Sequence, residues 1–80
     1  MFVKMFVKST FGIDDRTYAK LEDACRSMGI DLGNMSEAKR LADLNADKLD
    51  DIKAVVAQMK AGLITDDEAI EQVKAMIVIP

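Results

Sequence analysis

From Val3 onward, the residues of the N-terminal stretch MFVKMFVKSTFGI alternate between two sets. One set of alternate positions is mostly apolar and comprises Val3, Met5, Val7, Ser9, Phe11 and Ile13. The other set carries the lysines and comprises Phe2, Lys4, Phe6, Lys8, Thr10 and Gly12. Because successive side chains of a strand point to opposite faces, this alternation predicts an N-terminal β-strand with one mostly apolar face.

A helix is predicted over residues 15–28 from signals at both of its ends. Asp14 or Asp15 can cap the start, because a carboxylate accepts hydrogen bonds from the free N–H groups of a first turn. Gly29 stops it, since glycine readily adopts the left-handed conformation that ends helices. Apolar positions recur between these ends at helical spacing: Tyr18, Leu21, Cys25 and Met28. On this face Cys25 is interpreted as a buried, inert thiol.

A second helix is predicted to begin near Met35. Asn34 followed three residues later by Glu37 fits a capping box, in which each residue satisfies a free backbone N–H of the first turn. Asn45 can act as a cap in the same way, so it predicts a bend or the start of a new helix at that point.

Two more helical segments follow this junction. The first has a strong apolar stripe and stops at Gly62, and the second starts at Thr65, which forms a capping box with Glu68. The final residues 76–80, MIVIP, are apolar and β-branched. They are interpreted as either a short terminal strand or an exposed docking segment.

Composition and charge exclude several classes of function. The 80 residues carry a net charge of −3, which argues against gripping nucleic acid by bulk electrostatics. With no histidine and a single cysteine, the chain lacks the commonest general base and any cysteine-rich zinc site. We therefore expect neither an enzyme nor a bound cofactor or metal. No apolar run approaches the roughly 20 residues of a membrane span, so a cytoplasmic protein is expected.

The stretch VKSTFGIDDRTYAKLEDACRSMGI resembles the ribbon–helix–helix family of DNA-binding repressors and antitoxins. The resemblance lies in the order of parts: a short strand, an acidic or Ser cap, a helix, a turn and a second helix. In that family two chains pair their strands into a ribbon that enters the major groove, so the resemblance implies a homodimer. By position, the residues facing DNA would be Lys4, Lys8 and Thr10. Asn34 and Ser36, at the start of the second helix, would meet a phosphate.

The expected fold is thus mostly helical with an N-terminal strand, in one compact domain. Residues 1–45 would form the ribbon–helix–helix-like segment, and residues 46–80 a helical extension. The predicted function is a small homodimeric transcriptional regulator or an antitoxin, whose residues 46–80 would block a toxin. The alternative is a small protein–protein interaction module or inhibitor without DNA binding. In that case the first strand would pair with MIVIP or with the sheet edge of a partner.

Overall fold

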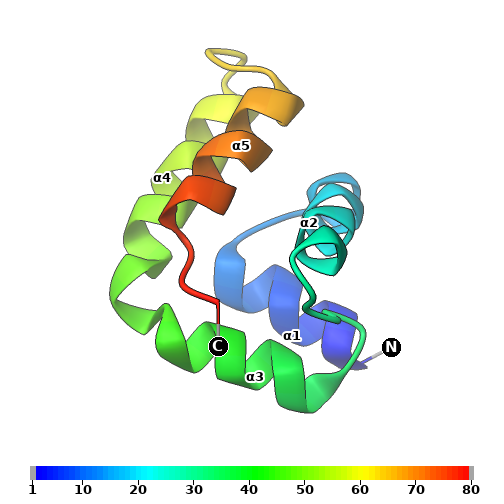
Figure 1. Ribbon diagram of the computed structural model, residues 1–80. Helices are drawn as coiled ribbons and strands as arrows, with labels where there is room; N and C mark the ends of the chain where they lie inside the picture. The colour runs from blue at the N-terminus through cyan, green and yellow to red at the C-terminus, as the bar shows by residue number, and fades with distance from the viewer. Residues whose placement is uncertain (1, 80) are drawn as a thin grey trace.

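The computed structural model describes residues 2–79, which form helices and connecting segments and contain no strand (Figure 1). The elements are α1 (Phe2–Phe11), α2 (Asp15–Ser27), α3 (Met35–Leu44), the short 3-10 helix η1 (Ala46–Lys48), α4 (Leu49–Lys60) and α5 (Asp66–Met76). The prediction of an N-terminal strand was wrong, because that segment is α1. The ribbon–helix–helix-like fold was wrong with it, since a paired ribbon requires that strand.

A repeat of four residues explains why the first segment was misinterpreted. In MFVKMFVK the four-residue repeat fits the two-residue period of a strand. It also fits an α-helix, because positions four residues apart are rotated by only about 40° around the helix axis. The helix therefore gathers Val3, Val7 and Phe11 on one face, each four residues after the last. Val7 and Phe11 are both 0% exposed there. Burial of this face against the rest of the chain stabilises the helix more than propensity does.

Gly12 ends α1 and turns the chain into α2. Its φ of +68° is in the left-handed region that favours glycine. The N–H of Ile13 then donates to the carbonyl of Lys8 at 3.0 Å, which is the closing hydrogen bond of a Schellman motif. α2 ends in the same way at Gly29. The tripeptide Gly-Ile-Asp follows both helices, so the sequence does contain a helix-end signal at residues 12–14.

The predicted helix starts are confirmed, with one difference in detail. The side chains of Asp14 and Asn34 accept hydrogen bonds from the first turns of α2 and α3. Thr65 and Glu68 form a complete capping box at α5. At α3 the box is only half formed, because the carboxylate of Glu37 accepts from the N–H of Asp31 instead of from Asn34.

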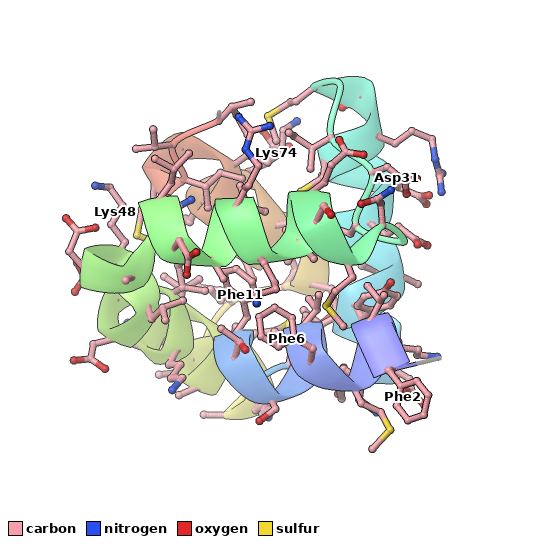
Figure 2. The ribbon with its side chains drawn as sticks, turned by 90° about the horizontal axis from the view of Figure 1, so that it is seen from below. Phe2, Phe6, Phe11, Asp31, Lys48 and Lys74 are labelled. Atoms are coloured by element: carbon pink, nitrogen blue, oxygen red, sulfur yellow. The ribbon has the colours of Figure 1, made fainter. Side chains whose placement is uncertain are left out.

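The helices pack around one core. α4 and α5 form a hairpin, α2 lies against α5, and α1 contacts α2, α3 and α4. α1 and α3 run side by side in the same direction (Figures 1 and 2). Large buried residues from all five α-helices and from the loop before α3 meet in this core: Val7, Phe11, Tyr18, Leu21, Leu32, Leu41, Ile52, Val56, Ile70 and Val73.

Residues 77–79 follow α5 in an extended conformation and do not form a strand, and the last residue of the predicted MIVIP segment lies outside the described residues. After α5, Ile77 and Ile79 are half-buried against the core, so this segment docks on its own chain. The predicted break at Asn45 is confirmed, because α3 ends there and η1 follows. Its predicted role as a cap was wrong. The Asn45 side chain does not cap the next helix but is fully buried and bonds to Val78.

Candidate functional site

The outer face of α1 carries large apolar side chains that the fold leaves uncovered. Phe2 is 77% exposed and Met5 is 64% exposed, while Phe6 is half-buried. Spacings of three and four residues place all three on one side of the helix. Figure 2 shows Phe2 pointing away from the body of the protein and Phe6 lying between α1 and α3. We call Phe2, Met5 and Phe6 the apolar strip.

Three other large apolar residues are exposed, Leu44, Leu63 and Val78. Leu63 lies in the loop between α4 and α5, and Leu44 and Val78, which come together through the Asn45 side chain, are 45% and 43% exposed. Single apolar side chains on a surface are normal, whereas contiguous ones mark interaction sites. The apolar strip therefore stands apart from the rest of the described surface.

The opposite face of the same helix is already used by the fold. Val7 and Phe11 are fully buried there, and Val3 packs partly against them. A helix that is apolar on both sides is normally covered on both sides. Within the described residues, the rest of the chain covers only one side of α1.

The lysines predicted to contact DNA are held by an acidic residue of α2. Lys8 Nζ lies 2.6 Å and Lys4 Nζ 3.4 Å from the same oxygen, Oδ1 of Asp15. The hydrogen bond from Lys8 and the charge of Lys4 hold the pKa of Asp15 below its ordinary value. Lys4 also lies 5.7 Å from the centre of the Tyr18 ring. This cluster joins α1 to α2, and both lysines remain partly exposed.

The other residues predicted to contact DNA lie outside this cluster. Thr10 is half-buried in α1, while Asn34 caps α3 and Ser36 is exposed in its first turn. The Asn34 side chain accepts a hydrogen bond from the N–H of Glu37, so its acceptor oxygen is occupied. The Glu37 carboxylate also stands beside this helix start, where it disfavours a phosphate. The structure thus brings together Lys4 and Lys8 but not the predicted set as a whole.

Two further lysines lie at the C-terminal end of α1. Lys60 Nζ donates to the carbonyl of Gly12 at 3.4 Å. The Lys53 stem passes so close to Gly12 that a Cβ placed there would be 3.1 Å from Lys53 Cγ. We call Lys4, Lys8, Lys53 and Lys60 the basic rim of α1. Sequence reasoning singled out Lys4 and Lys8 but missed Lys53, Lys60 and the strip, because a strand would place Phe2 and Met5 on opposite faces.

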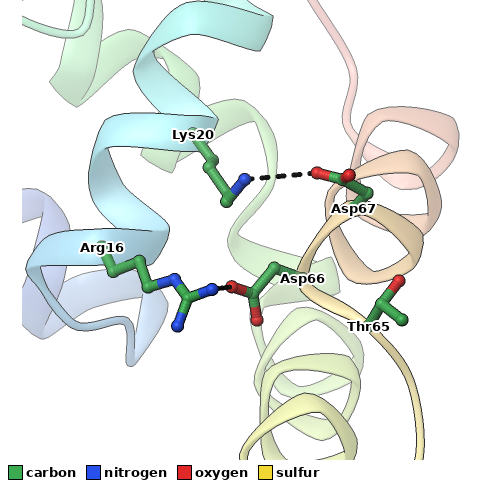
Figure 3. Close-up of a pocket in the computed structure, with 5 residues that line it drawn as sticks. All are labelled: Arg16, Lys20, Thr65, Asp66 and Asp67. Carbon is green, nitrogen blue, oxygen red and sulfur yellow. Dashed lines mark hydrogen bonds and ion pairs between the residues drawn. The ribbon is translucent and has the colours of Figure 1, made fainter.

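An open hollow of about 340 Å³ lies between α2 and the start of α5, lined by Arg16, Lys20, Thr65, Asp66 and Asp67 (Figure 3). Two ion pairs cross it, with Arg16 Nη2 2.7 Å from Asp66 Oδ2 and Lys20 Nζ 3.2 Å from Asp67 Oδ1. The charges of the hollow are thus paired with one another. We interpret it as the attachment of α5 to α2 rather than as a ligand site.

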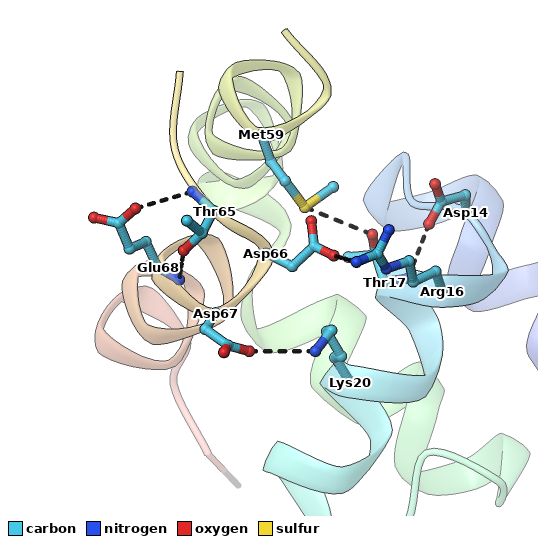
Figure 4. Close-up of polar contacts among 9 residues, drawn as sticks. All are labelled: Asp14, Arg16, Thr17, Lys20, Met59, Thr65, Asp66, Asp67 and Glu68. Atoms are coloured by element: carbon cyan, nitrogen blue, oxygen red, sulfur yellow. Dashed lines mark hydrogen bonds and ion pairs between the residues drawn. The ribbon is translucent and has the colours of Figure 1, made fainter. Parts of the chain in front are cut away.

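Further polar contacts around this attachment are structural (Figure 4). The Thr17 hydroxyl donates to Met59 Sδ at 3.8 Å, which links α2 to α4. Asp66 Oδ2 is buried and accepts no aligned hydrogen bond, so its contact with Arg16 is an ion pair without hydrogen-bond geometry.

Residues 2–79 offer few side chains suited to nucleophilic catalysis or to metal binding. The Cys25 thiol is fully buried, and burial raises its pKa to about 11, so it stays protonated at neutral pH. The same residues contain no cluster of three or more side chains able to hold a metal ion. Nor is any helix among them long and apolar enough to cross a membrane.

Comparisons of the chain with protein-family models, with curated proteins and with solved structures found no match. The functional interpretation therefore depends on the geometry of the apolar strip and its surroundings.

Proposed function

We propose that the protein is a small interaction module, without catalytic activity, that binds another protein through the apolar strip of α1. The observation that carries this proposal is the exposure of Phe2 and Met5, 77% and 64%, on one face of a helix whose opposite face is already in the core. A partner that covers the strip removes this apolar surface from water.

The size of the strip suits a short contact between two amphipathic segments. Burying one side chain such as Phe or Met stabilises a complex by about 1.5–3 kcal/mol. Apolar anchors three and four residues apart are the arrangement through which one amphipathic helix packs on an apolar partner surface. Much of the gain is offset by the entropy of association, so a micromolar rather than a nanomolar complex is expected.

DNA binding stays an untested prediction with less support than the interaction module. It depended on a paired ribbon, and residues 2–11 are helical. Lys4 and Lys8 point to Asp15, and Thr10 is half-buried. We also propose a cytoplasmic location, which fits a chain whose one cysteine is a buried free thiol.

The proposal is tested by photo-crosslinking followed by measured affinity. A photo-reactive amino acid replaces Met5 in the cells that make the protein, and Leu63, which is 75% exposed in the loop between α4 and α5, is the matched control position. We expect one protein to be trapped from position 5 and not from position 63. The purified partner should then bind the Phe2→Ser/Met5→Ser variant at least about tenfold more weakly than the natural protein or Leu63→Ser.

The proposal fails if the double variant binds that partner with unchanged affinity, or if position 5 traps nothing above the level of position 63. Because both side chains are exposed, the free energy of unfolding of the double variant should lie within about 0.5 kcal/mol of that of the natural protein. A loss of binding would then not be caused by a loss of folding. Binding of duplex DNA that Lys8→Ala weakens would instead favour the regulator prediction.

A further inference from the structure

We infer that the surface covering the apolar strip is an amphipathic segment of a partner protein whose apolar centre is edged by carboxylates. This inference rests on the proposed function and adds the chemistry of the partner. It is carried by the charges around α1, which differ in sign from those of the whole chain.

The N-terminal half of the basic rim is only partly neutralised. Lys4 and Lys8 share a single oxygen of Asp15, so two positive charges meet one negative charge. α1 itself contains no acidic residue. The two lysine side chains keep 46% and 33% of their exposure, which leaves them able to meet further acceptors.

The C-terminal half of the rim has the same sign. Lys53 and Lys60 lie against Gly12, and the charge of Lys60 also acts on the carboxylate of Asp14, two residues further along the chain. Lys53 and Lys60 lie at the far end of α1 from Phe2, so the charge nearest the strip is that of Lys4 and Lys8, two positive charges against the single carboxylate of Asp15. The chain as a whole carries −3, so the surroundings of α1 are basic on an otherwise acidic protein.

This distribution disfavours the two other occupants of an apolar helix face. A symmetric contact between two copies would bring the same patch together from both sides, with Lys4 and Lys8 contributed twice, and like charges across an interface cost affinity. An anionic membrane surface attracts clusters of several free Lys or Arg residues, whereas this rim is small and partly paired. A protein edged with Asp or Glu satisfies both the strip and the rim.

The test uses two synthetic helical peptides of about 18 residues with the same leucine face. Their flanking positions are all Glu in one peptide and all Lys in the other. Binding to the full chain is measured by fluorescence anisotropy at low and at high salt. We expect the Glu peptide to bind at least about tenfold more tightly at low salt, and the difference to shrink at high salt because screening weakens exposed charges.

Variants of the rim and of the strip should separate the two contributions. Lys4→Gln/Lys8→Gln keeps most of each side-chain stem and should remove most of the preference for Glu. Lys4→Glu/Lys8→Glu should reverse the preference, with circular dichroism to check that the fold survives repulsion from Asp15. The Phe2→Ser/Met5→Ser variant should bind both peptides more weakly, by the same factor. The Leu63→Ser variant should bind both with unchanged affinity.

Several outcomes overturn the inference. Equal binding of the two peptides removes the charge preference and leaves the proposed function standing. A dimer that persists on dilution in light scattering, and that Phe2→Ser/Met5→Ser dissociates, assigns the strip to a second copy. Sedimentation with phosphatidylserine vesicles that the same variant abolishes assigns it to lipid. Failure of both peptides to bind overturns the inference too, and the crosslinking experiment then decides the proposed function separately.

Discussion

The side-chain amide of Asn45 pairs with both backbone groups of Val78, 33 residues away. The Val78 N–H donates to Asn45 Oδ1 at 2.6 Å, and Asn45 Nδ2 donates to the Val78 carbonyl at 3.0 Å. Nδ2 also donates to the Leu41 carbonyl at 2.7 Å. One buried amide thus supplies the hydrogen bonds that a neighbouring strand would offer, and the extended tail needs no sheet.

Replacing Asn45 by Ala should therefore release the tail. The variant loses three hydrogen bonds at a site that is 0% exposed and leaves the N–H and the carbonyl of Val78 without partners, while the Leu41 carbonyl keeps the backbone N–H of residue 45. We expect a loss of about 2–3 kcal/mol in the free energy of unfolding, measured by urea denaturation. Hydrogen exchange of the Val78 amide should become fast in the same variant.

The matched control is Val78→Ala, which keeps the backbone groups that bond to Asn45 and removes a side chain that is 43% exposed. Its cost should stay below about 1 kcal/mol. Equal costs for the two variants would mean that the tail is held by apolar packing and not by the Asn45 amide.

Replacing Gly12 by Ala should destabilise the protein by about 1–2 kcal/mol, because its φ of +68° is unfavourable for residues with a Cβ. The new methyl group would also stand 3.1 Å from Lys53 Cγ, so that side chain must shift. A strand at this position would give the opposite sign, since glycine weakens strands. Thermal unfolding decides between the two, and a stabilised Gly12→Ala variant would contradict the helix end.

Gly29→Ala serves as the comparison, because its φ is +88° but nothing lies within 4 Å of its added Cβ. It should lower the free energy of unfolding by about 1 kcal/mol, which is the cost of the left-handed backbone conformation alone. A larger loss for Gly12→Ala than for Gly29→Ala measures the contact with Lys53.

The stability of the start of α2 should depend on pH through Asp14. The N–H of Thr17 donates to the Asp14 carboxylate at 2.8 Å and holds the pKa of this carboxyl below its ordinary value. A folded-state pKa below the unfolded one stabilises the protein above the unfolded pKa, about 3.9, and the contribution is lost as pH falls through the lower folded pKa. Because the carboxyl is exposed, we expect a modest effect of about 2–4 °C in Tm.

Asp14→Asn isolates this contribution, since Asn caps helices as well as Asp but does not titrate. At pH 7 the two proteins should have similar Tm values. Between pH 5 and pH 2 the Tm of the natural protein should fall further than that of Asp14→Asn. Parallel curves would show that Asp14 contributes nothing to acid unfolding.

Local chemistry alone determined where most helices begin and end. Asp14, Asn34 and Thr65 accept hydrogen bonds from the first turns that follow them, and Gly29 is left-handed after α2. Such signals act over three or four residues, so they can be recognised in the sequence without knowledge of the fold. This is why α2, α3, α4 and α5 were predicted correctly from residue patterns.

Tertiary packing decided the rest. The tetrads of residues 1–8 suit a strand and a helix equally, and burial of Val7 and Phe11 among the other helices selects the helix, which the helix-end signal at residues 12–14 then closes. That choice moves Phe2 and Met5 onto one face and creates the apolar strip. The local pattern likewise predicts that Asn45 caps a helix. Its side-chain amide instead bonds to Val78, because the fold brings the C-terminal segment next to it. Contacts between residues far apart in the chain determine both outcomes, and local patterns do not encode such contacts.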